Sequence, residues 1–405
     1  MHARTDIHDS SYAWFRLLVS VLLGAIGSVG MWAYVVVLPA VQEEFGVDRA
    51  EASLPYTTTM IGFALGNVLI GRYVDRVGIA IPVIGSAIAL AAGFSLAAAS
   101  PHLWQFAAIH GVLIGLGTSA TCGPLIADIS HWFRARRGLA VALTAAGNYI
   151  AGAIWPNILA PLLSSDGWRT TYLIIAAVCI LAMVPLALLL RRPAPVEINP
   201  QGGAAAHAVR QIDLSPRALQ ALLIIAGIAC CVAMSMPQVH IVAYCADLNY
   251  GVARGAEMLS LMLLGGTISR IASGFLADYI GGVRTLLIGS IGQMLALVLY
   301  VPFDGLTSLY IVSLIFGLSQ GGIVPSYAII IREYLPAREA GQRVGIVIMA
   351  TVAGMALGGW MSGWIYDLTG SYRAAFLNGI AWNLLNIAII LLVLGRTRTL
   401  RPAPA

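Results

Sequence analysis

Apolar runs of about 20 residues recur along almost the whole chain, and they constrain the fold more than any other feature of the sequence. A helix of that length rises about 30 Å, which is the thickness of the hydrocarbon core of a bilayer. The chain is 59% hydrophobic and only 10% charged, whereas a soluble domain carries about a quarter charged residues. Only helices and closed barrels satisfy their backbone groups in lipid, and strand-like alternation is missing. The sequence therefore predicts an all-α polytopic membrane protein.

The apolar runs predict twelve transmembrane helices. Their ranges are 17–41, 54–74, 79–99, 103–127, 138–163, 170–190, 219–245, 255–279, 283–302, 307–330, 342–366 and 373–395. The first run is too long for the core of a signal peptide and has no small-residue cleavage site, so we expect a mature helix. The five cysteines fall inside spans without metal-ligand spacing, and neither a metal nor a cofactor is expected.

The basic residues predict the orientation of the chain. All 23 are arginine, and eighteen of them lie in the termini and in alternate loops. By the positive-inside rule this asymmetry places both termini in the cytoplasm, with the chain in a cell inner membrane. Basic groups dispersed over short loops that face an anionic leaflet also explain the net charge of +5. No nucleic-acid partner is therefore expected.

The chain contains a repeat. The stretch GFALGNVLIGRYVDRVG (62–78) aligns with GGTISRIASGFLADYIG (265–281), and GWRTTY (167–172) aligns with SYRAAF (371–376). An even number of spans separates the copies, so six helices recur in the same orientation. The predicted division is an N-terminal half at 1–190, a cytoplasmic linker at 191–217 and a C-terminal half at 218–405.

Two parallel six-helix halves joined by a cytoplasmic linker resemble the major facilitator fold, in which substrate binds midway between the halves. GRYVDRVG (71–78) resembles the signature of that superfamily between its second and third helices. The resemblance implies that Asp75 and Arg76 act in gating. The second copy keeps the acid as Asp278. Asp128, where the fourth span meets the inner loop, is expected to be a further gate partner.

Arg270 lies in an otherwise apolar span. It is eight residues, about 12 Å along a helix, from Asp278 at the cytoplasmic end, which places it near the bilayer midplane. No carboxylate occurs between Glu257 and Asp278. An unpaired arginine at that depth costs about 2.5–3.5 kcal/mol, and such residues usually face an aqueous cavity. The equivalent residue in the first half is Asn67, so the fold itself does not require a cation there.

Two interpretations of Arg270 remain open from the residues alone. Backbone carbonyls or a distant tyrosine could satisfy the guanidinium, or the missing anion could be the cargo. A guanidinium donates two parallel hydrogen bonds to a carboxylate and keeps its charge at physiological pH. One cation matches one carboxylate, because a dicarboxylate would leave a buried charge unpaired. The pattern favours a small organic monocarboxylate as cargo.

Further stretches resemble the monocarboxylate porter family and its bacterial relatives, which include oxalate–formate exchangers. They are HWFRARRGLAVALTAAG (131–147) and PQVHIVAYCADLNYG (237–251), the latter followed by the span of Arg270. The resemblance implies transport of small organic acids, often with a proton, and Arg270 matches the carboxylate-binding arginine of the family. The chain departs from the family pattern at three positions. Animal members carry an aspartate one turn before that arginine, where this chain has Gly266, and a lysine in helix one, which falls near Val35 here. The second cation of the oxalate exchanger corresponds to Thr351.

Five other residues are candidates for the site. Tyr327 follows a glycine-rich break and approximately matches the binding tyrosine of the family. Tyr34 lies in the middle of the first span. At least one of Asn148 and Tyr149 is expected to face the cavity, because an unsatisfied amide in lipid is costly. His240 either takes the proton that accompanies a carboxylate or is a hydrogen-bonded core histidine.

The sequence thus predicts a secondary active transporter of small monocarboxylates that is proton-coupled, works by alternating access and functions as a monomer. The alternative is an organic-anion exchanger, either oxalate/formate-like or for aromatic acids. An enzyme is not expected, because the chain has no HExxH motif, no paired carboxylates within a span and no nucleotide-binding loop. A sensor is disfavoured because the tail GRTRTLRPAPA (395–405) is short.

Overall fold

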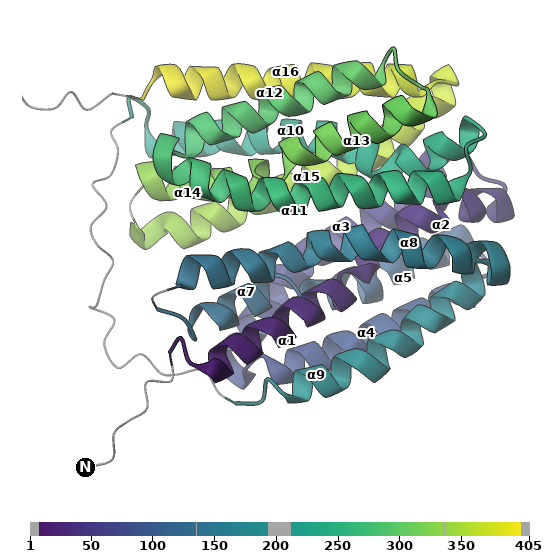
Figure 1. Ribbon diagram of the computed structural model, residues 1–405, viewed down its shortest axis with the longest axis horizontal. Helices are drawn as coiled ribbons and strands as arrows, with labels where there is room; N and C mark the ends of the chain where they lie inside the picture. The colour runs from purple at the N-terminus through teal and green to yellow at the C-terminus, as the bar shows by residue number, and fades with distance from the viewer. Residues whose placement is uncertain (1–7, 135, 193–211, 336, 398–405) are drawn as a thin grey trace, which may run out of the picture.

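The computed structural model describes residues 8–134, 136–192, 212–335 and 337–397, which form a bundle of long helices (Figure 1). Within these ranges the β-structure is an isolated bridge between Ile212 and Thr397. The predicted all-α class is confirmed. Ten stretches of the described residues are long and apolar enough to cross a membrane.

The helices up to residue 192 cover the first six predicted spans. They are α1 (Ser11–Gly27), α2 (Val29–Phe45), α3 (Arg49–Val77), α4 (Ala80–Ala98), α5 (Leu103–Ile109), the π-helix η1 (His110–Gly115), α6 (Leu116–Ser119), α7 (Gly123–Ser130), α8 (Arg137–Val178), the π-helix η2 (Cys179–Met183) and α9 (Val184–Leu188).

The helices from residue 212 onward cover the other six. They are α10 (Pro216–Asp247), α11 (Val252–Ile280), α12 (Gly282–Tyr300), α13 (Leu306–Gln320), α14 (Ile323–Tyr334), α15 (Ala337–Thr369) and α16 (Tyr372–Gly395).

The ten stretches differ from the twelve predicted spans at two places, although every predicted span falls on one helix or on consecutive helices. The span at 54–74 lies on α3, which is absent from the ten; Arg72, Asp75 and Arg76 lie close together near its end. The spans at 138–163 and 170–190 fall in one stretch of 51 residues, Gly138–Leu188. A straight helix of that length would extend about 75 Å, more than twice the bilayer core. Gly167 interrupts it with φ of +74°, a left-handed value that glycine adopts without a steric penalty.

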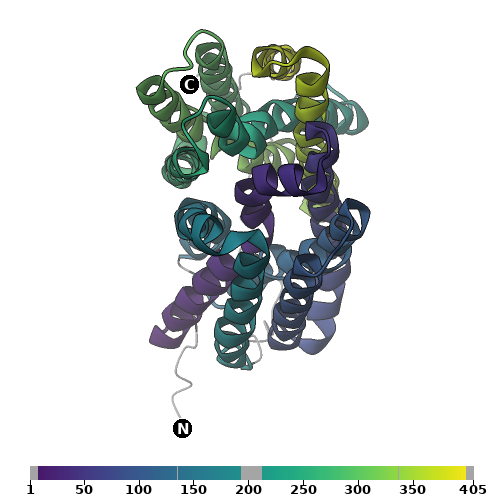
Figure 2. The same ribbon diagram turned by 90° about the vertical axis from the view of Figure 1, so that its right-hand side faces the viewer.

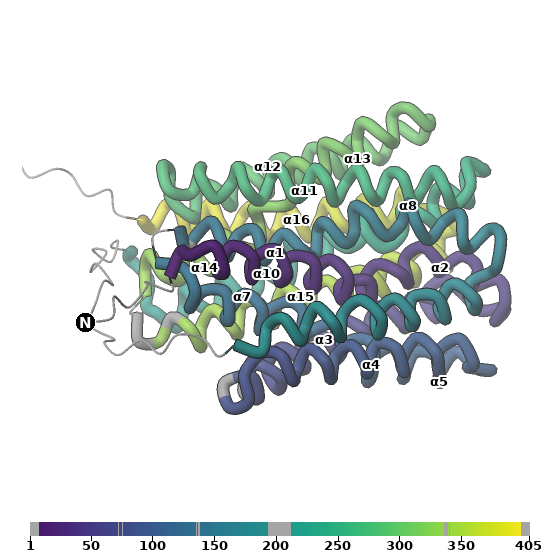
Figure 3. Tube along the Cα trace, turned by 60° about the horizontal axis from the view of Figure 1, so that its bottom comes forward, coloured from purple at the N-terminus to yellow at the C-terminus, as the bar shows by residue number. Residues whose placement is uncertain are grey.

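The helices gather in two groups. In Figure 1, α10 to α16 lie above α1 to α9, and Figure 2 shows the same two groups from the side. Helix α8 packs along α11, and α3 packs along α15, so these four helices join the groups. The tube in Figure 3 shows how nearly parallel the long helices run.

The two ends of the bundle are distinct. We call the end where α10 begins and α16 ends the linker end. There the amide of Asp213 donates to the carbonyl of Arg396 at 2.9 Å. The opposite end, where α2 ends and α3 begins, is called the far end.

Glycines give the two groups the same close helix packing. A Cβ on Gly115 would clash with the carbonyl oxygen of Thr59, and a Cβ on Gly317 would clash with that of Met262. These are equivalent positions in the sequence repeat. The repeat therefore extends from sequence to backbone contacts.

Helix breaks occur along three of the predicted spans. The breaks follow Gly27 between α1 and α2, Ser119 between α6 and α7, and Gln320 between α13 and α14. Discontinuous helices are where transporter folds place their binding sites, since the freed backbone groups line a cavity. The last break lies against α11, because a Cβ on Gly321 would clash with the carbonyl oxygen of Gly266.

Candidate functional site

Arg270 bridges the two groups of helices. Its side chain is partly exposed and extends from α11 to α8. Nη1 donates to the carbonyl oxygen of Ala145 at 3.0 Å, and Nε donates to that of Gly321 at 3.4 Å. The guanidinium carbon lies 4.2 Å from the centre of the Tyr149 ring, a cation–π contact. The guanidinium is thus held between α8, α11 and the break after α13.

The positive charge of Arg270 contacts polar groups of the protein but is not neutralised by a carboxylate of the described residues. Among the described residues, none of the ion pairs within 4.0 Å includes this arginine. Its partners are two carbonyl groups and an aromatic ring. These are the partners expected under the interpretation that the protein itself satisfies the guanidinium. Carbonyl dipoles and a ring face leave the net positive charge in place. The cation therefore keeps the capacity to bind an anion.

Gly266, one turn before Arg270, makes room for Tyr149. A Cβ on Gly266 would lie 2.5 Å from Tyr149 Cε1, closer than real side-chain carbons approach. This contact leaves no room for a side chain at position 266 while the Tyr149 ring keeps its present position. An aspartate side chain at position 266 would therefore overlap the ring.

Asn148 and Tyr34 do not reach Arg270. The Asn148 side chain accepts a hydrogen bond from Trp32 Nε1 at 3.0 Å, which holds it against α2. Tyr34 is buried, and its hydroxyl donates to the carbonyl oxygen of Ala52. Both residues pack within the first group of helices.

Tyr327 lies apart from Arg270 as well. It is fully buried, and its hydroxyl donates to Asn386 Oδ1 at 3.1 Å. Asn386 in turn donates to Ser290 Oγ at 2.8 Å. The Tyr327 hydroxyl, which was expected to face the cargo, forms a hydrogen bond that joins α14 to α16.

His240 is part of a polar cluster at the far end. Its Nε2 lies 2.8 Å from the carbonyl oxygen of Gly359, and its Nδ1 lies 3.2 Å from the hydroxyl of Tyr372. A carbonyl only accepts, so Nε2 carries a hydrogen and Nδ1 of the neutral ring accepts from the tyrosine. Both ring nitrogens are therefore satisfied in the neutral form.

Arg49 connects this cluster to the first group of helices. Its Nη1 donates to the Tyr372 hydroxyl at 2.6 Å, and its Nη2 pairs with Asp247 at 3.1 Å. The Asp367 carboxylate accepts the backbone amides of Arg49 at 2.9 Å and Ala50 at 2.7 Å. We call Arg49, Asp247, Asp367, Tyr372 and His240 the far-end cluster. It joins the start of α3 to α10, α15 and α16.

The sequence profile of the Major Facilitator Superfamily matches residues 20–316 and 246–405. The chain belongs to this superfamily. "Monocarboxylate transporter 13" of Rattus norvegicus is 27% identical over 383 residues, which cover 92% of this chain and 87% of the relative. "Monocarboxylate transporter 11" of Homo sapiens is 26% identical over 328 residues, covering 77% and 67%. These relatives confirm the resemblance to monocarboxylate porters, and they indicate a transporter.

The fold is that of a major facilitator transporter in solved structures too. A bacterial homolog of the human lysosomal transporter Spinster, in an inward-facing and occupied conformation, superposes with a TM-score of 0.75. The alignment covers 97% of this chain and 100% of that one, at 14% identity. The predicted twelve-helix architecture in two six-helix halves is confirmed at the level of the fold.

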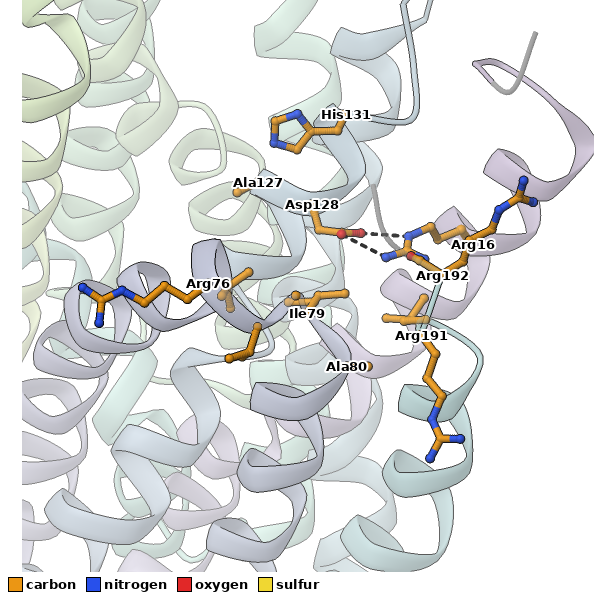
Figure 4. Close-up of a pocket in the computed structure, with 13 residues that line it drawn as sticks. Arg16, Arg76, Ile79, Ala80, Ala127, Asp128, His131, Arg191 and Arg192 are labelled. Atoms are coloured by element: carbon orange, nitrogen blue, oxygen red, sulfur yellow. Dashed lines mark hydrogen bonds and ion pairs between the residues drawn. The ribbon is translucent and has the colours of Figure 1, made fainter. Parts of the chain in front are cut away.

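In this major facilitator protein, Asp128 pairs within the first group of helices. Its carboxylate binds Arg16 Nε and Nη2, each at 2.9 Å, and both side chains are buried (Figure 4). The guanidinium also lies 4.5 Å from the centre of the Trp132 ring. Because its partner comes from α1 of the same group, the pair does not bridge the two groups, and the gating role expected of Asp128 stays a prediction.

The other gating candidates lie near the linker end. Arg76 is exposed and borders a pocket of about 520 Å³ that Asp128 and Arg16 also line. Its side chain points away from them (Figure 4). Asp278 is exposed at the end of α11. Asp75 lies on α3, and its side chain falls outside the described part of the chain. The gating role of these residues stays a prediction.

Three buried polar residues were missed by sequence reasoning. His110 is fully buried inside a predicted span, with Nε2 3.2 Å from the Tyr172 hydroxyl. Its position within a predicted span could have indicated from the sequence that it contributes to packing. Arg16 lies at the edge of the first span, and Arg49 lies in a predicted outer loop. Both are buried, which the hydropathy of the chain does not indicate.

Proposed function

We propose that this transporter carries a small organic monocarboxylate, whose carboxylate binds Arg270. The observation that carries the proposal is a guanidinium between α8 and α11 with no carboxylate partner among the described residues. Arginine donates in a planar fork that fits a carboxylate. The two named relatives, which are monocarboxylate transporters, support the same class of cargo.

The contacts of Arg270 suggest how cargo binding couples to transport. A bound carboxylate competes for Nη1, which now donates to Ala145 on α8, and for Nε, whose bond to Gly321 is long at 3.4 Å. Binding therefore exchanges a contact between the two helix groups for a contact with the cargo. Such differential contacts bias an alternating-access equilibrium.

The proposed architecture for this function has a half at 1–190, a linker at 191–217 and a half at 218–405, which rock about the site. We place both termini in the cytoplasm, as the arginine distribution predicts, and the protein in a cell inner membrane. A single chain contains the whole proposed site, so a functional monomer suffices.

We further propose that His240 takes the accompanying proton. In the far-end cluster the neutral ring accepts a hydrogen bond from Tyr372, which itself accepts from Arg49. A protonated ring has no acceptor nitrogen, so Tyr372 loses that bond, and the imidazolium faces the Arg49 cation. Asp247 and Asp367 are the other charged groups of the cluster, and Tyr244 packs against Tyr372. Protonation thus favours opening of the far end.

His240→Gln tests this coupling in proteoliposomes. We expect acid-driven uptake to fall at least tenfold while counterflow of the same acid continues, because only net uptake needs the proton. An unchanged pH dependence would exclude His240 as the proton carrier. Obligatory exchange without any proton dependence in the wild type would favour the organic-anion exchanger.

Arg270→Lys tests the cargo site directly. A point ammonium does not reproduce the fork, and a charge-assisted hydrogen bond contributes about 1.5–3 kcal/mol. Uptake of monocarboxylate should therefore require a roughly 10- to 100-fold higher concentration. Arg373→Lys is the control, because that side chain is 63% exposed at the far end and should transport as the wild type does. Equal loss in both variants would argue against a specific anion site.

A further inference from the structure

Two buried amide side chains face each other beside Arg270. Gln238 lies on α10 and Gln320 is the last residue of α13. Nε2 of Gln238 donates to Oε1 of Gln320 at 2.6 Å. Their side chains are 1% and 0% exposed.

The pair leaves two strong hydrogen-bonding groups unused. Among the described residues, neither Gln238 Oε1 nor Gln320 Nε2 has a partner. Leaving a buried polar group unsatisfied costs about 1–3 kcal/mol, so native structures keep few of them. Rotating both amides by 180° would exchange the roles of the two residues but would still leave one donor and one acceptor.

The unused donor lies at the place where α11 carries no side chain. A Cβ on Gly266 would be 3.6 Å from Gln320 Nε2 and 2.5 Å from Tyr149 Cε1. The residue after Gln320 is Gly321, whose carbonyl accepts from Arg270 Nε. Gln320, the Tyr149 ring and the Arg270 guanidinium therefore lie close together around Gly266, and Gln238 joins them through its hydrogen bond to Gln320.

The fold does not require these amides. In the repeat, the position equivalent to Gln320 is Thr118, at the same spacing that aligns the Gly-Leu pairs at 115–116 and 317–318. The Thr118 hydroxyl donates to the carbonyl oxygen of Ile114 at 2.8 Å within its own helix. An equivalent buried position is thus filled by a side chain with a satisfied donor.

We propose that Gln238 and Gln320 hold a neutral polar group of the cargo and select hydroxylated monocarboxylates. The proposal rests on the proposed function, in which Arg270 holds the carboxylate. A hydroxyl oxygen accepts from Gln320 Nε2 while its hydrogen is donated to Gln238 Oε1, so it satisfies both unused groups. A methyl group at the same place satisfies neither, and a site built for a hydroxyl rejects the analogue that lacks it.

The test compares matched acids on purified protein. Binding of propionate is compared with lactate, and butyrate with 3-hydroxybutyrate, by isothermal titration. We expect the wild type to bind at least one hydroxy acid tenfold or more tightly than its unsubstituted partner. Gln320→Met, which keeps the volume and removes both amide groups, should lose that preference and still bind the unsubstituted acid.

Gln293→Met is the matched control. Gln293 is also fully buried, its Nε2 donates to the carbonyl of Cys230, and its Oε1 has no partner among the described residues. It lies on α12, so its replacement should leave the preference unchanged. Thermal unfolding of both variants checks that they are folded. Each substitution removes one hydrogen bond together with one unsatisfied atom, so both variants should show a similar, small fall in melting temperature.

The outcomes separate the two proposals. Equal binding of both acids by the wild type, with binding still lost in Arg270→Ala, would overturn the role of the amides and keep the carboxylate site. A preference that survives in Gln320→Met would also overturn it. Binding that persists in Arg270→Ala would overturn the proposed function itself, and the selection mechanism with it.

Discussion

At the scale of single residues, the site depends on two side chains and one missing side chain. Arg270 supplies the charge, Tyr149 supports it, and Gly266 leaves the space in which they meet. A ring face, and not a carboxylate, lies against the guanidinium here, so Arg270 keeps its net charge.

Gly266→Ala should damage this arrangement. Its Cβ would overlap the Tyr149 ring, and overpacking of this kind costs about 1–3 kcal/mol. We expect a lower melting temperature in detergent and slower uptake. Gly274→Ala on the same helix is the control, since nothing lies within 4 Å of its Cβ position. Adding Tyr149→Leu should recover stability but not transport. Full recovery of both stability and uptake in the double variant would contradict the proposed contact, and so would an unchanged Gly266→Ala protein.

The sequence predicted Arg270 because one cation in an apolar run is conspicuous. It could not predict partners, because the rotation of each helix decides where a side chain points. Tyr34 and Tyr327 were plausible from their depth, yet their hydroxyls bind Ala52 and Asn386 inside the helix groups. The amides of Gln238 and Gln320 were overlooked for the same reason, since their pairing depends on how α10 meets α13.

At the scale of helices, the two groups are held together differently along the bundle. Near the middle, α8 and α11 share the Arg270 contacts. At the far end, the Asp367 carboxylate caps the start of α3 from α15. A carboxylate at a helix N-terminus is stabilised both by the free amides and by the helix dipole. The far-end cluster therefore stabilises the form in which that end is closed.

Asp367→Asn should loosen the far end. The neutral amide accepts more weakly from the α3 amides, and a change of about 1–2 kcal/mol corresponds to a 5- to 30-fold shift in an equilibrium. Cysteine placed at Ser53, which is fully buried on α3, reports the opening through its rate of labelling by a membrane-impermeant maleimide. We expect the rate to rise at least fivefold.

Glu44→Gln is the control for this measurement. Glu44 pairs with Arg169 at 2.7 Å at the same end, but both residues belong to the first group of helices. Its loss should leave labelling at Ser53→Cys unchanged. Similar labelling rates in the Asp367→Asn and Glu44→Gln proteins would show that the contact between the groups does not hold the far end closed.

At the scale of the whole molecule, the repeat in the sequence determines most of the fold. The same glycine contacts recur at Gly115 and Gly317, so the repeat in the sequence corresponds to a repeat in helix packing. Composition alone was less reliable. The ten apolar stretches leave α3 out and merge 138–188 into one, whereas the polar stretch SSDGWR (164–169) around Gly167 separates the two predicted spans there.

The orientation of the molecule is a further prediction at this scale. With twelve spans and arginine-rich alternate loops, both termini should face the cytoplasm. Protease added to right-side-out vesicles should spare epitope tags at both termini, and protease added to inverted vesicles should remove both. Tags cleaved from opposite sides would contradict an even number of spans.

The central claim is that the Arg270 guanidinium is the anion site, and equilibrium binding measures it most directly. Titration of monocarboxylates into purified wild-type protein, Arg270→Ala and Arg373→Ala compares them under identical conditions, with thermal unfolding as a check of folding. The account predicts saturable binding to wild type and Arg373→Ala, and affinity at least a hundredfold weaker in folded Arg270→Ala. Wild-type affinity in Arg270→Ala would contradict it.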